Sequence, residues 1–387
     1  MNPSQTGVVS LDSGLQRKGW MKEGLLQSRS KSVFDGLTGK TKDAVVMHAS
    51  LEAEATGHEV TFDMDGNASG AGVVDKEQLW GNEEEKRKFS DYIRARRIRW
   101  GLNNGDKFEA KNIGDLRLAE HSHSRTQLAD LYVRQKDQMC FDAACGFLDS
   151  NDASHIIRPN RRATIGDLVA GDKAGYDFMM DTEEIIKTGR GFTVGTDRRP
   201  LEPVQFADGR RMWIWMVDAR VARDLRKDSN FITINSQADI RGMDNRLIKG
   251  VIGTYGAFLV MEMMDFYGKS DSRTIGKSQV EICGLRKADS QGLFNGETGY
   301  GVGAGVVKAS RSLIFGAGAL QIGFSRQTDY KFQESQDYGI TSGSALEVWM
   351  NVQKTILKDE NHDYEDAKVA GFDYGVVSVD TFHSVNA

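Results

Sequence analysis

The side chains whose types and spacing most clearly offer chemistry are charged residues near position 90. Four arginines alternate along a predicted strand, Arg94 and Arg96 on one face and Arg97 and Arg99 on the other. Three glutamates precede them, Glu83, Glu84 and Glu85. Guanidinium groups bind carboxylates through paired donors, so the pattern predicts contacts between copies of the chain. A solvated strand face is the alternative. A nucleic-acid site is disfavoured, because only Tyr92 and Trp100 offer aromatic stacking.

Glycine-rich segments that could bind phosphate depart from the required spacing. Residues 36–41 read Gly-Leu-Thr-Gly-Lys-Thr, but a phosphate loop needs a glycine at position 34, where this chain has Phe34. The alternating glycines of residues 299–305 miss the dinucleotide-binding pattern, because position 304 is alanine and position 306 is valine. A mobile loop is the favoured interpretation of this second segment, with a nucleotide-binding enzyme as the alternative.

Metal-binding and nucleophilic groupings are also incomplete. His121 and His123 are two residues apart on a predicted helix, so they point about 200° apart and cannot chelate one ion. The Asp-x-Asp-x-Asn stretch of residues 63–67 begins like a calcium loop, but the glycine and glutamate that such a loop needs are absent. Cys140 and Cys145 lack Cys-x-x-Cys spacing and are interpreted as packing residues. The sequence therefore predicts no catalytic residue, no cofactor and no metal site.

Composition indicates a globular chain with a mildly acidic balance. The 387 residues contain 50 Lys and Arg against 55 Asp and Glu, so the net charge is 50 − 55 = −5. With 39% hydrophobic residues the chain can bury a sizeable core, and nothing in its overall charge indicates a nucleic-acid or membrane partner. Glycine is abundant (42) and proline scarce (4), which indicates a flexible chain that needs an external source of stability, such as burial between subunits.

Compartment signals favour the cytoplasm as the place of synthesis. Three cysteines are too few for a disulfide framework and fit a reducing environment. The first 20 residues contain no apolar core of a signal peptide, and the richest apolar stretch, residues 257–264, is interrupted by Glu262. Neither secretion nor a membrane span is expected.

The elements that would hold the charged residues begin with an arm and a hairpin. Residues 1–50 are polar with isolated apolar positions, which indicates an arm or, alternatively, a disordered tail. Residues 58–64 and 89–100 have strand spacing around a polar turn, so they predict a long hairpin. A two-stranded hairpin is marginal in water and needs a neighbour to lie on.

A long helix and an α+β body are predicted to follow. Residues 116–147 have helical spacing, equivalent to a rod of roughly 45 Å. We further predict strands at 211–217, 257–262, 319–324, 345–350 and 375–381, and helices at 219–226 and 306–315. Residues 268–305 are interpreted as a long polar excursion. The fold class is α+β, without a regular βαβ succession.

This order of arm, hairpin, long helix and α+β body resembles the Hong Kong 97-like capsid fold of tailed phages. The segment Leu-Trp-Gly-Asn-Glu-Glu at 79–84, followed by Phe-Ser-Asp-Tyr-Ile at 89–93, is similar to the major capsid family of schitovirus-type podophages. The helix end at 131–141 and the body segments at 213–226 and 250–262 are similar as well. The resemblance spans about 58–324 and is carried by the ordered set of blocks.

The resemblance implies five regions of the chain. They are an N-terminal arm at 1–50, an extended β-hairpin loop at 51–107, a spine helix with the peripheral domain at 108–160, an axial domain with peripheral elements at 161–330, and C-terminal strands returning to the peripheral domain at 331–387. The arm, residues 268–305 and the last 60 residues depart most from the family pattern. These parts are expected to carry contacts particular to this shell.

The implied function is that of a major capsid protein, which is structural and not an enzyme. It would assemble as hexamers and pentamers into an icosahedral head around double-stranded DNA, and it would be made in the host bacterial cytoplasm and reside in the virion. Implied partners are further copies of itself, a portal protein, scaffolding and decoration proteins, and DNA through weak contacts. The alternative within the same architecture is an encapsulin-like compartment shell.

Overall fold

The computed structural model describes residues 32–41, 43–50, 59–65, 88–106, 113–145, 155–163, 167–193, 200–206, 209–230, 251–263, 309–336, 341–357 and 372–382, with residues 73, 74, 78, 80 and 83. Its described helices are α2 (Ile113–Cys145), α3 (Tyr176–Thr188) and α4 (Ala219–Lys227), with short 3-10 turns at Asp35–Leu37 and Pro159–Arg161. Its described strands are β1 (Thr38–Gly39), β2 (Val46–Ser50), β3 (Glu59–Asp65), β4 (Lys88–Arg94), β5 (Arg96–Asp106), β6 (Ile156–Ile157), β7 (Val204–Gln205), β8 (Arg211–Asp218), β9 (Val251–Tyr255), β10 (Phe258–Met263), β11 (Ala309–Phe315), β12 (Leu320–Gln336), β13 (Thr341–Lys354), β14 (Ile356–Leu357), β15 (Phe372–Asp373) and β16 (Val376–Phe382).

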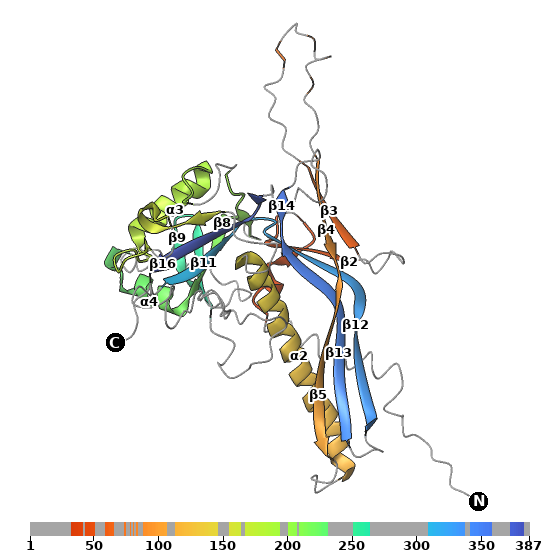
Figure 1. Cartoon of the computed structure of the whole chain (residues 1–387). Helices are drawn as coiled ribbons and strands as arrows, with labels where there is room; N and C mark the ends of the chain where they lie inside the picture. The colour runs from red at the N-terminus through yellow and green to blue at the C-terminus, as the bar shows by residue number, and fades with distance from the viewer. Residues whose placement is uncertain are drawn as a thin grey trace, which may run out of the picture.

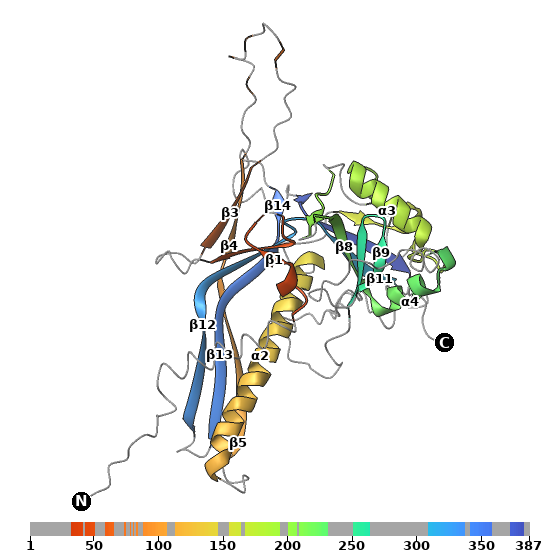
Figure 2. The ribbon, with the colours of Figure 1, turned by 180° about the vertical axis from the view of Figure 1, so that it is seen from behind.

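A long helix and a five-stranded sheet, here called the spine sheet, form the elongated half of the molecule (Figure 1). The strand order is β1-β2-β12-β13-β5, and α2 runs along one face (Figures 1 and 2). Strands β12 and β13 pair antiparallel, with irregularities in register near Arg326 and Asp329. Such bulges bend a strand, which is consistent with the curvature of both strands in Figure 1.

The 33-residue helix α2 confirms the long helix that the sequence predicts, with slightly different ends. It contains no proline, and its one glycine lies at the second position, so nothing inside it breaks the backbone ladder. At 1.5 Å per residue it is about 50 Å long. Leu128, Tyr132 and Val133 bury one side of it, and the ring of Tyr132 packs edge-on against Trp100 of β5.

The predicted hairpin is also confirmed. β3 and β4 pair antiparallel, with Val60 opposite Ile93 and Met64 opposite Phe89. The two strands stand at the corner of the molecule, above the spine sheet in Figure 1. Residues 66–72 lie outside the described residues. Within the hairpin Phe62, Ile93 and Asp91 are buried, so its base is anchored to the body, whereas Arg94 is exposed.

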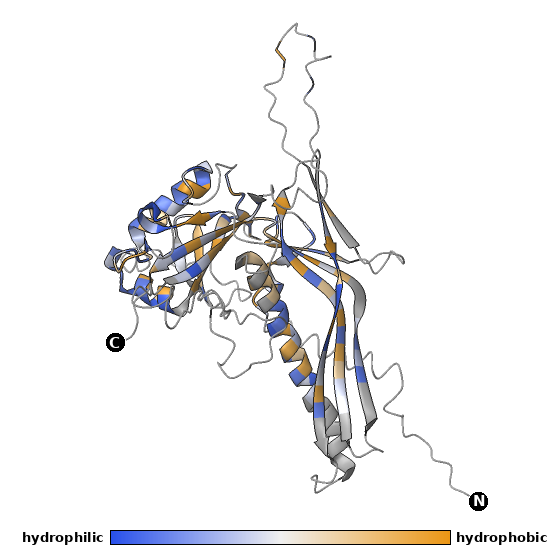
Figure 3. Ribbon diagram, in the orientation of Figure 1, coloured by the Kyte–Doolittle hydropathy of each residue, from blue (hydrophilic) through white to orange (hydrophobic). Residues whose placement is uncertain are grey.

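A larger sheet, here called the lobe sheet, forms the second half of the molecule. Its order is β6-β16-β11-β8-β10-β9, with β7 paired to β8. β8 reads Met-Trp-Ile-Trp-Met-Val, a nearly continuous apolar run of the kind found in strands covered on both faces. Ile214 and Met216 face the core shared with α2, whereas Trp213 and Trp215 face a second core beneath α3 and α4. Figure 3 shows apolar residues concentrated along this sheet.

The chain from residue 32 onward packs into the core that α2 shares with the lobe sheet. The sequence predicts instead that the first 50 residues form an arm. Phe34 is fully buried, and its ring meets Phe141 of α2 at 4.9 Å and Phe315 of β11 at 5.9 Å, edge-on in both cases. β2 then pairs parallel with β12. Residues 1–31 lie outside the described residues.

Two glycines allow the chain just after β11 to pack closely against the chain just before β16. The backbone N–H of Gly316 donates to the carbonyl of Gly375 over 2.8 Å. A Cβ atom at Gly375 would lie 2.6 Å from the Cα atom of Ala319, closer than two such atoms can approach. This position therefore requires glycine for space.

Two expectations from the sequence are wrong. The helix predicted at 306–315 is strand β11 from Ala309 onward, because this apolar segment pairs with β16 and β8 inside the lobe sheet. The single return strand predicted at 89–100 is divided at Ala95 into β4 and β5, which belong to different sheets. Strands β8, β10, β12, β13 and β16 and helix α4 occur where strands and a helix are predicted. Within the described part of the chain, no helix is long and apolar enough to cross a membrane.

Candidate functional site

The candidate site is the face of the spine sheet that α2 leaves open. Along β13 the residues alternate: Leu346, Val348 and Met350 are buried toward the helix, and Glu347 and Trp349 point the other way. This is the alternation expected of a strand with one buried face. The open face therefore presents charged and aromatic side chains drawn from three adjacent strands.

Glu347 is the centre of this face. One of its oxygens, Oε2, accepts a hydrogen bond from Arg97 Nη2 of β5 at 2.7 Å and another from Lys331 Nζ of β12 at 3.2 Å. The other, Oε1, accepts from the indole N–H of Trp349 at 3.2 Å. Arg99 Nε lies 4.0 Å from the same carboxylate. Three cationic side chains from two flanking strands thus converge on one acidic group.

The electrostatics follow from this geometry. Hydrogen bonding to Arg97 lowers the pKa of Glu347 to about 2, with further lowering from Lys331 and Trp349. The same hydrogen bond raises the pKa of Arg97. The Arg97 guanidinium also lies over the ring of Trp349, 5.9 Å from its centroid, in a cation–π contact. The face is thus a fixed array of positive donors, of which Arg99 and Lys331 stay largely exposed.

The base of the hairpin is tied to this sheet by amide side chains. Gln353 Nε2 donates to the Asp91 carboxylate at 3.0 Å and to the carbonyl of Tyr92 at 3.1 Å. Asn351 Nδ2 donates to the carbonyl of Arg94 at 3.1 Å. β4 is not a member of the spine sheet, and these contacts from β13 take the place of a backbone ladder. They fix the point from which the hairpin leaves the body.

The predicted arginines are divided by the break at Ala95. Arg97 and Arg99 share the open face of β5, as predicted, and meet at Glu347. Arg94 belongs to the hairpin, where it lies opposite Glu59. Arg96 is exposed and forms no ion pair with another described residue.

The predicted glutamates are described only in part. Glu83 is exposed, and Glu84 and Glu85 lie outside the described residues. Their contact with another copy stays a prediction. Sequence reasoning missed Glu347 and Lys331, and the polar positions of 345–350 were the one signal available for Glu347.

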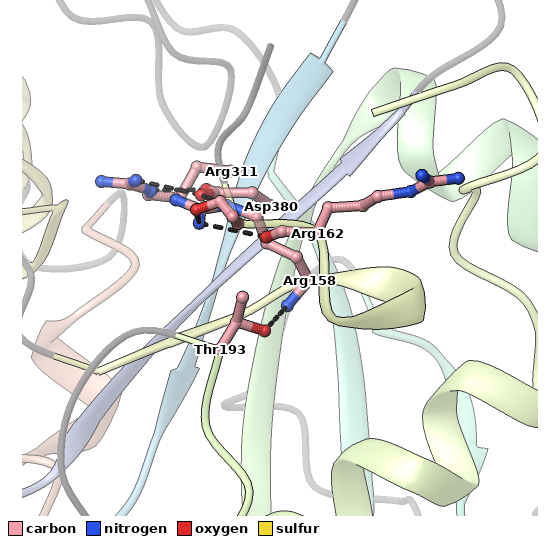
Figure 4. Close-up of polar contacts among 6 residues, drawn as sticks. Arg158, Arg162, Thr193, Arg311 and Asp380 are labelled. Atoms are coloured by element: carbon pink, nitrogen blue, oxygen red, sulfur yellow. Dashed lines mark hydrogen bonds and ion pairs between the residues drawn. The ribbon is translucent and has the colours of Figure 1, made fainter. Parts of the chain in front are cut away.

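A second polar cluster lies inside the lobe sheet (Figure 4). The Asp380 carboxylate accepts from Arg311 Nε at 2.7 Å, from Arg311 Nη2 at 3.2 Å and from Arg158 Nε at 3.1 Å. Arg158 also donates to the carbonyl of Ala163 at 2.6 Å, and its backbone N–H donates to Thr193 Oγ1. All three charged side chains are buried. The cluster ties β16 and β11 to the loop after β6, which is a structural role.

A third cluster holds the beginning of the described chain against α2. The Asp137 carboxylate accepts from Ser32 Oγ at 2.7 Å and from the backbone N–H of Val33 at 3.0 Å. Its neighbour Lys136 forms an ion pair with Asp35. Burial raises the pKa of Asp137 to about 6, against the lowering effect of its two donors. None of the described residues forms a cluster of three or more potential metal ligands.

Comparisons with known proteins agree on one class. Residues 9–385 match the family described as phage capsid protein. The chain is 21% identical to a major capsid protein of Pseudomonas phage KPP25, over 94% of both chains. Its fold is similar to the capsid of Ralstonia phage GP4, with a TM-score of 0.68 and 18% identity over 92% of both chains.

Two further solved structures have the same fold. The head structure of Helicobacter pylori bacteriophage KHP40 matches with a TM-score of 0.64 and 15% identity, over 92% of this chain and 91% of the other. The capsid of cyanophage Pam1 matches with a TM-score of 0.61 and 13% identity, over 92% and 93%. The α+β architecture is thus the Hong Kong 97-like fold that the sequence predicts.

Proposed function

The chain belongs to the phage capsid protein family, and on that basis we propose that it is the major capsid protein of a tailed bacteriophage. It is a structural protein and not an enzyme. We further propose that it assembles as hexamers and pentamers into an icosahedral head around double-stranded DNA. It would be made in the host bacterial cytoplasm and reside in the virion.

The observation that carries this proposal is the exposed hairpin on a chain with the family's architecture. Trp80, between the strands of the hairpin, is 87% exposed, and Val74 is 67% exposed. Tryptophan is one of the residues enriched at interfaces between proteins, so an exposed Trp80 fits a contact with another surface. We propose that other copies of the same chain cover these exposed side chains.

The arginine face supports the same proposal. Glu347 already accepts from three donors, and Arg99 approaches it only at 4.0 Å. Positive charge is therefore left over for a carboxylate from outside. We propose that Glu83, Glu84 and Glu85 of a neighbouring copy supply it, with Arg97 and Arg99 as the receiving side chains on this face. Arg96 lies opposite Met350, on the other face of β5, and Arg94 lies at the hairpin base. We propose that these two arginines contact the neighbouring copy outside this face. Portal, scaffolding and decoration proteins are further proposed partners.

Weak binding to packaged DNA follows from the charge of the chain. The net charge of −5 does not favour strong binding to DNA by the chain as a whole, so contacts with DNA would be local and salt-dependent. A strongly basic inner surface would hinder filling and release of the genome. The alternative of a compartment shell would be recognised by cargo protein in place of DNA inside the particles.

The testing experiment is electron microscopy and sedimentation velocity of the purified full chain. Closed shells, or rings of five and six copies, are expected. Replacing residues 66–87 by a short turn should leave a folded body that forms no shells. This deletion keeps β3 and β4, and it keeps β5 with its buried Trp100. Shells of normal yield from the shortened chain would contradict a role of residues 66–87 in contacts between copies.

The arginine contact has its own matched pair of variants. Arg96→Glu changes a side chain with no ion pair among the described residues, so it should reduce assembly without lowering Tm. Arg97→Glu also breaks the contact with Glu347 and should do both. Unchanged particle yield from Arg97→Glu would count against an intersubunit role for this face, and unchanged yield from Arg96→Glu would count against such a role for Arg96.

A further inference from the structure

Two helices on the lobe sheet have opposite and equal charge. α3 contains Asp177, Asp181, Glu183 and Glu184 against Lys187, a balance of −4 + 1 = −3. α4 contains Arg220, Arg223, Arg226 and Lys227 against Asp224, a balance of +4 − 1 = +3. Both helices bury their apolar side in the same core, so their charged sides face away from the sheet. Figure 3 shows both as largely hydrophilic on the outside of the lobe.

The acidic side of α3 is an unpartnered helix face. Asp177, Asp181 and Glu184 follow one another at helical spacing, are exposed, and form no ion pair with any described residue. Only Asp177 lies in the first turn, where the helix dipole favours an acid. The dipole therefore does not account for the other two. Met180 lies within the same row and is 48% exposed.

The basic side of α4 is its counterpart. Arg226 and Lys227 are exposed, and Arg223 is partly exposed. Arg226 pairs with Glu262 of β10, and Arg223 Nε lies 3.9 Å from Asp224. Lys227 forms no ion pair with a described residue. Within the described residues no ion pair joins the acidic row to the basic row. On α4, Arg223 and Arg226 have acidic partners of their own, and Lys227 has none among the described residues.

The two faces are placed for contact between copies. α3 lies along the upper edge of the lobe and α4 along its lower edge in Figure 1, and the reversed view keeps this separation (Figure 2). Two complementary patches on different flanks of one molecule give a heterologous contact, which closes into a ring when the rotation between copies permits. A two-fold contact would have to bring both flanks into one interface, with α3 against the partner's α4 and α4 against the partner's α3.

From this we infer that α3 of one copy docks on α4 of the next copy around a ring, acidic row against basic row, with Met180 in the contact. The inference rests on the proposed assembly function and names a contact that closes its rings. Rows of opposite charge that face each other determine how two copies align and which surfaces meet. They contribute less to the affinity between the copies. Methionine is enriched at interfaces between proteins, so the exposed Met180 fits a contact at this position.

Charge reversal and charge exchange test this contact in the full chain. Asp181→Lys with Glu184→Lys places two positive rows together, and Arg223→Glu with Lys227→Glu places two negative rows together. Asp181→Lys with Glu184→Lys should keep the circular dichroism and Tm of the unassembled chain. Arg223→Glu with Lys227→Glu also removes the contact of Arg223 with Asp224, so it should lower Tm somewhat. Both double variants should form shells at a yield lower by about tenfold or more. The four substitutions combined exchange the two rows, so they should restore shells.

The outcomes separate the inference from the function it rests on. Failure of the unchanged chain to form rings or shells overturns both. Shells from the unchanged chain together with normal yields from both double variants overturn only the helix contact. If the double variants block assembly and the fourfold exchange does not restore it, the two rows bind some other partner. That result also overturns the contact between α3 and α4. Asp181→Asn with Glu184→Gln keeps side-chain volume, and it should reduce yield at unchanged Tm even if a reversed variant misfolds.

Discussion

Arg97 of β5 and Glu347 of β13, 250 residues apart in the sequence, form an ion pair of 2.7 Å on the open face of the spine sheet. They lie on adjacent strands in a diagonal relation, because Arg97 is directly opposite Trp349 and Glu347 directly opposite Arg99. Each arginine therefore reaches the one carboxylate from a different side. The pair holds the guanidinium of Arg97 in a fixed orientation over Trp349.

The first prediction concerns the acid sensitivity of this contact. The pKa of Glu347 is lowered to about 2 from 4.5, so its stabilising contribution is complete above pH 4.5 and is lost as the pH falls toward 2. Glu347→Gln should lower Tm at pH 7 by roughly 2 °C. The difference from the unchanged chain should disappear between pH 4.5 and 2 in thermal unfolding.

The matched control is Asp329→Asn on the same sheet face. Asp329 is exposed, and its one ion pair among the described residues is with Lys331, at 3.6 Å. Its replacement should leave Tm within error at every pH. A constant offset for Glu347→Gln from pH 7 to pH 2 would show that the carboxylate charge is not what stabilises the contact.

The second prediction concerns Asp137 and runs in the opposite direction. Burial raises its folded pKa to about 6 from 3.8, so the folded chain takes up a proton that the unfolded chain does not. Its contribution to stability is complete below pH 3.8 and is lost as the pH rises through 6. Urea unfolding of the unassembled chain should show this as a gain of up to about 3 kcal/mol between pH 7 and pH 4.

Asp137→Asn isolates this effect. The amide oxygen can still accept from Val33 N–H, and the amide nitrogen can donate to Ser32 Oγ, so the contacts persist without the buried charge. This variant should be at least as stable as the unchanged chain at pH 7 and should lack the gain at lower pH. Equal pH profiles for both chains would exclude Asp137 as the titrating group.

The third prediction concerns the N-terminal segment. Phe34→Ala removes a fully buried ring that contacts both Phe141 and Phe315, so it should cost about 3–5 kcal/mol of unfolding free energy. Val74→Ala, at a position 67% exposed, should change stability by less than about 0.5 kcal/mol. Urea unfolding of the two variants checks both values. A small loss for Phe34→Ala would mean that residues 32–37 are not integral to the core.

Sequence patterns sufficed where local periodicity decides the structure. α2 has uninterrupted helical spacing, β8 is a continuous apolar run, and β3 and β4 alternate. The same reasoning failed for β11, since a short apolar segment fits a buried helix or a buried strand and only pairing with β16 decides. α3 was not predicted, although Met179, Thr182 and Ile186 have helical spacing and Gly189 follows in a left-handed cap conformation.

The candidate site was predictable only in part, because its partners are distant in sequence. Arg97 and Arg99 could be placed on one strand face from alternation alone. Their acidic partner could not, because which strand lies beside β5 depends on the fold of the last 60 residues. The break at Ala95 likewise depends on two sheets meeting there, and neither residue type nor spacing marks it.

The last prediction concerns the buried cluster around Asp380. Its carboxylate accepts three hydrogen bonds from two buried arginines, so Asp380→Asn removes the charge that both guanidinium groups share. The loss should be about 3–5 kcal/mol, because a buried charge deprived of its partner keeps its desolvation cost. Arg158→Met should cost less, since Arg311 still supplies two of the three hydrogen bonds to Asp380. Urea unfolding of the two variants measures both losses. If Arg158→Met is the more damaging change, the hydrogen bond from Arg158 to the carbonyl of Ala163 holds the C-terminal strand to the lobe sheet, and the charge pairing of Arg158 does not.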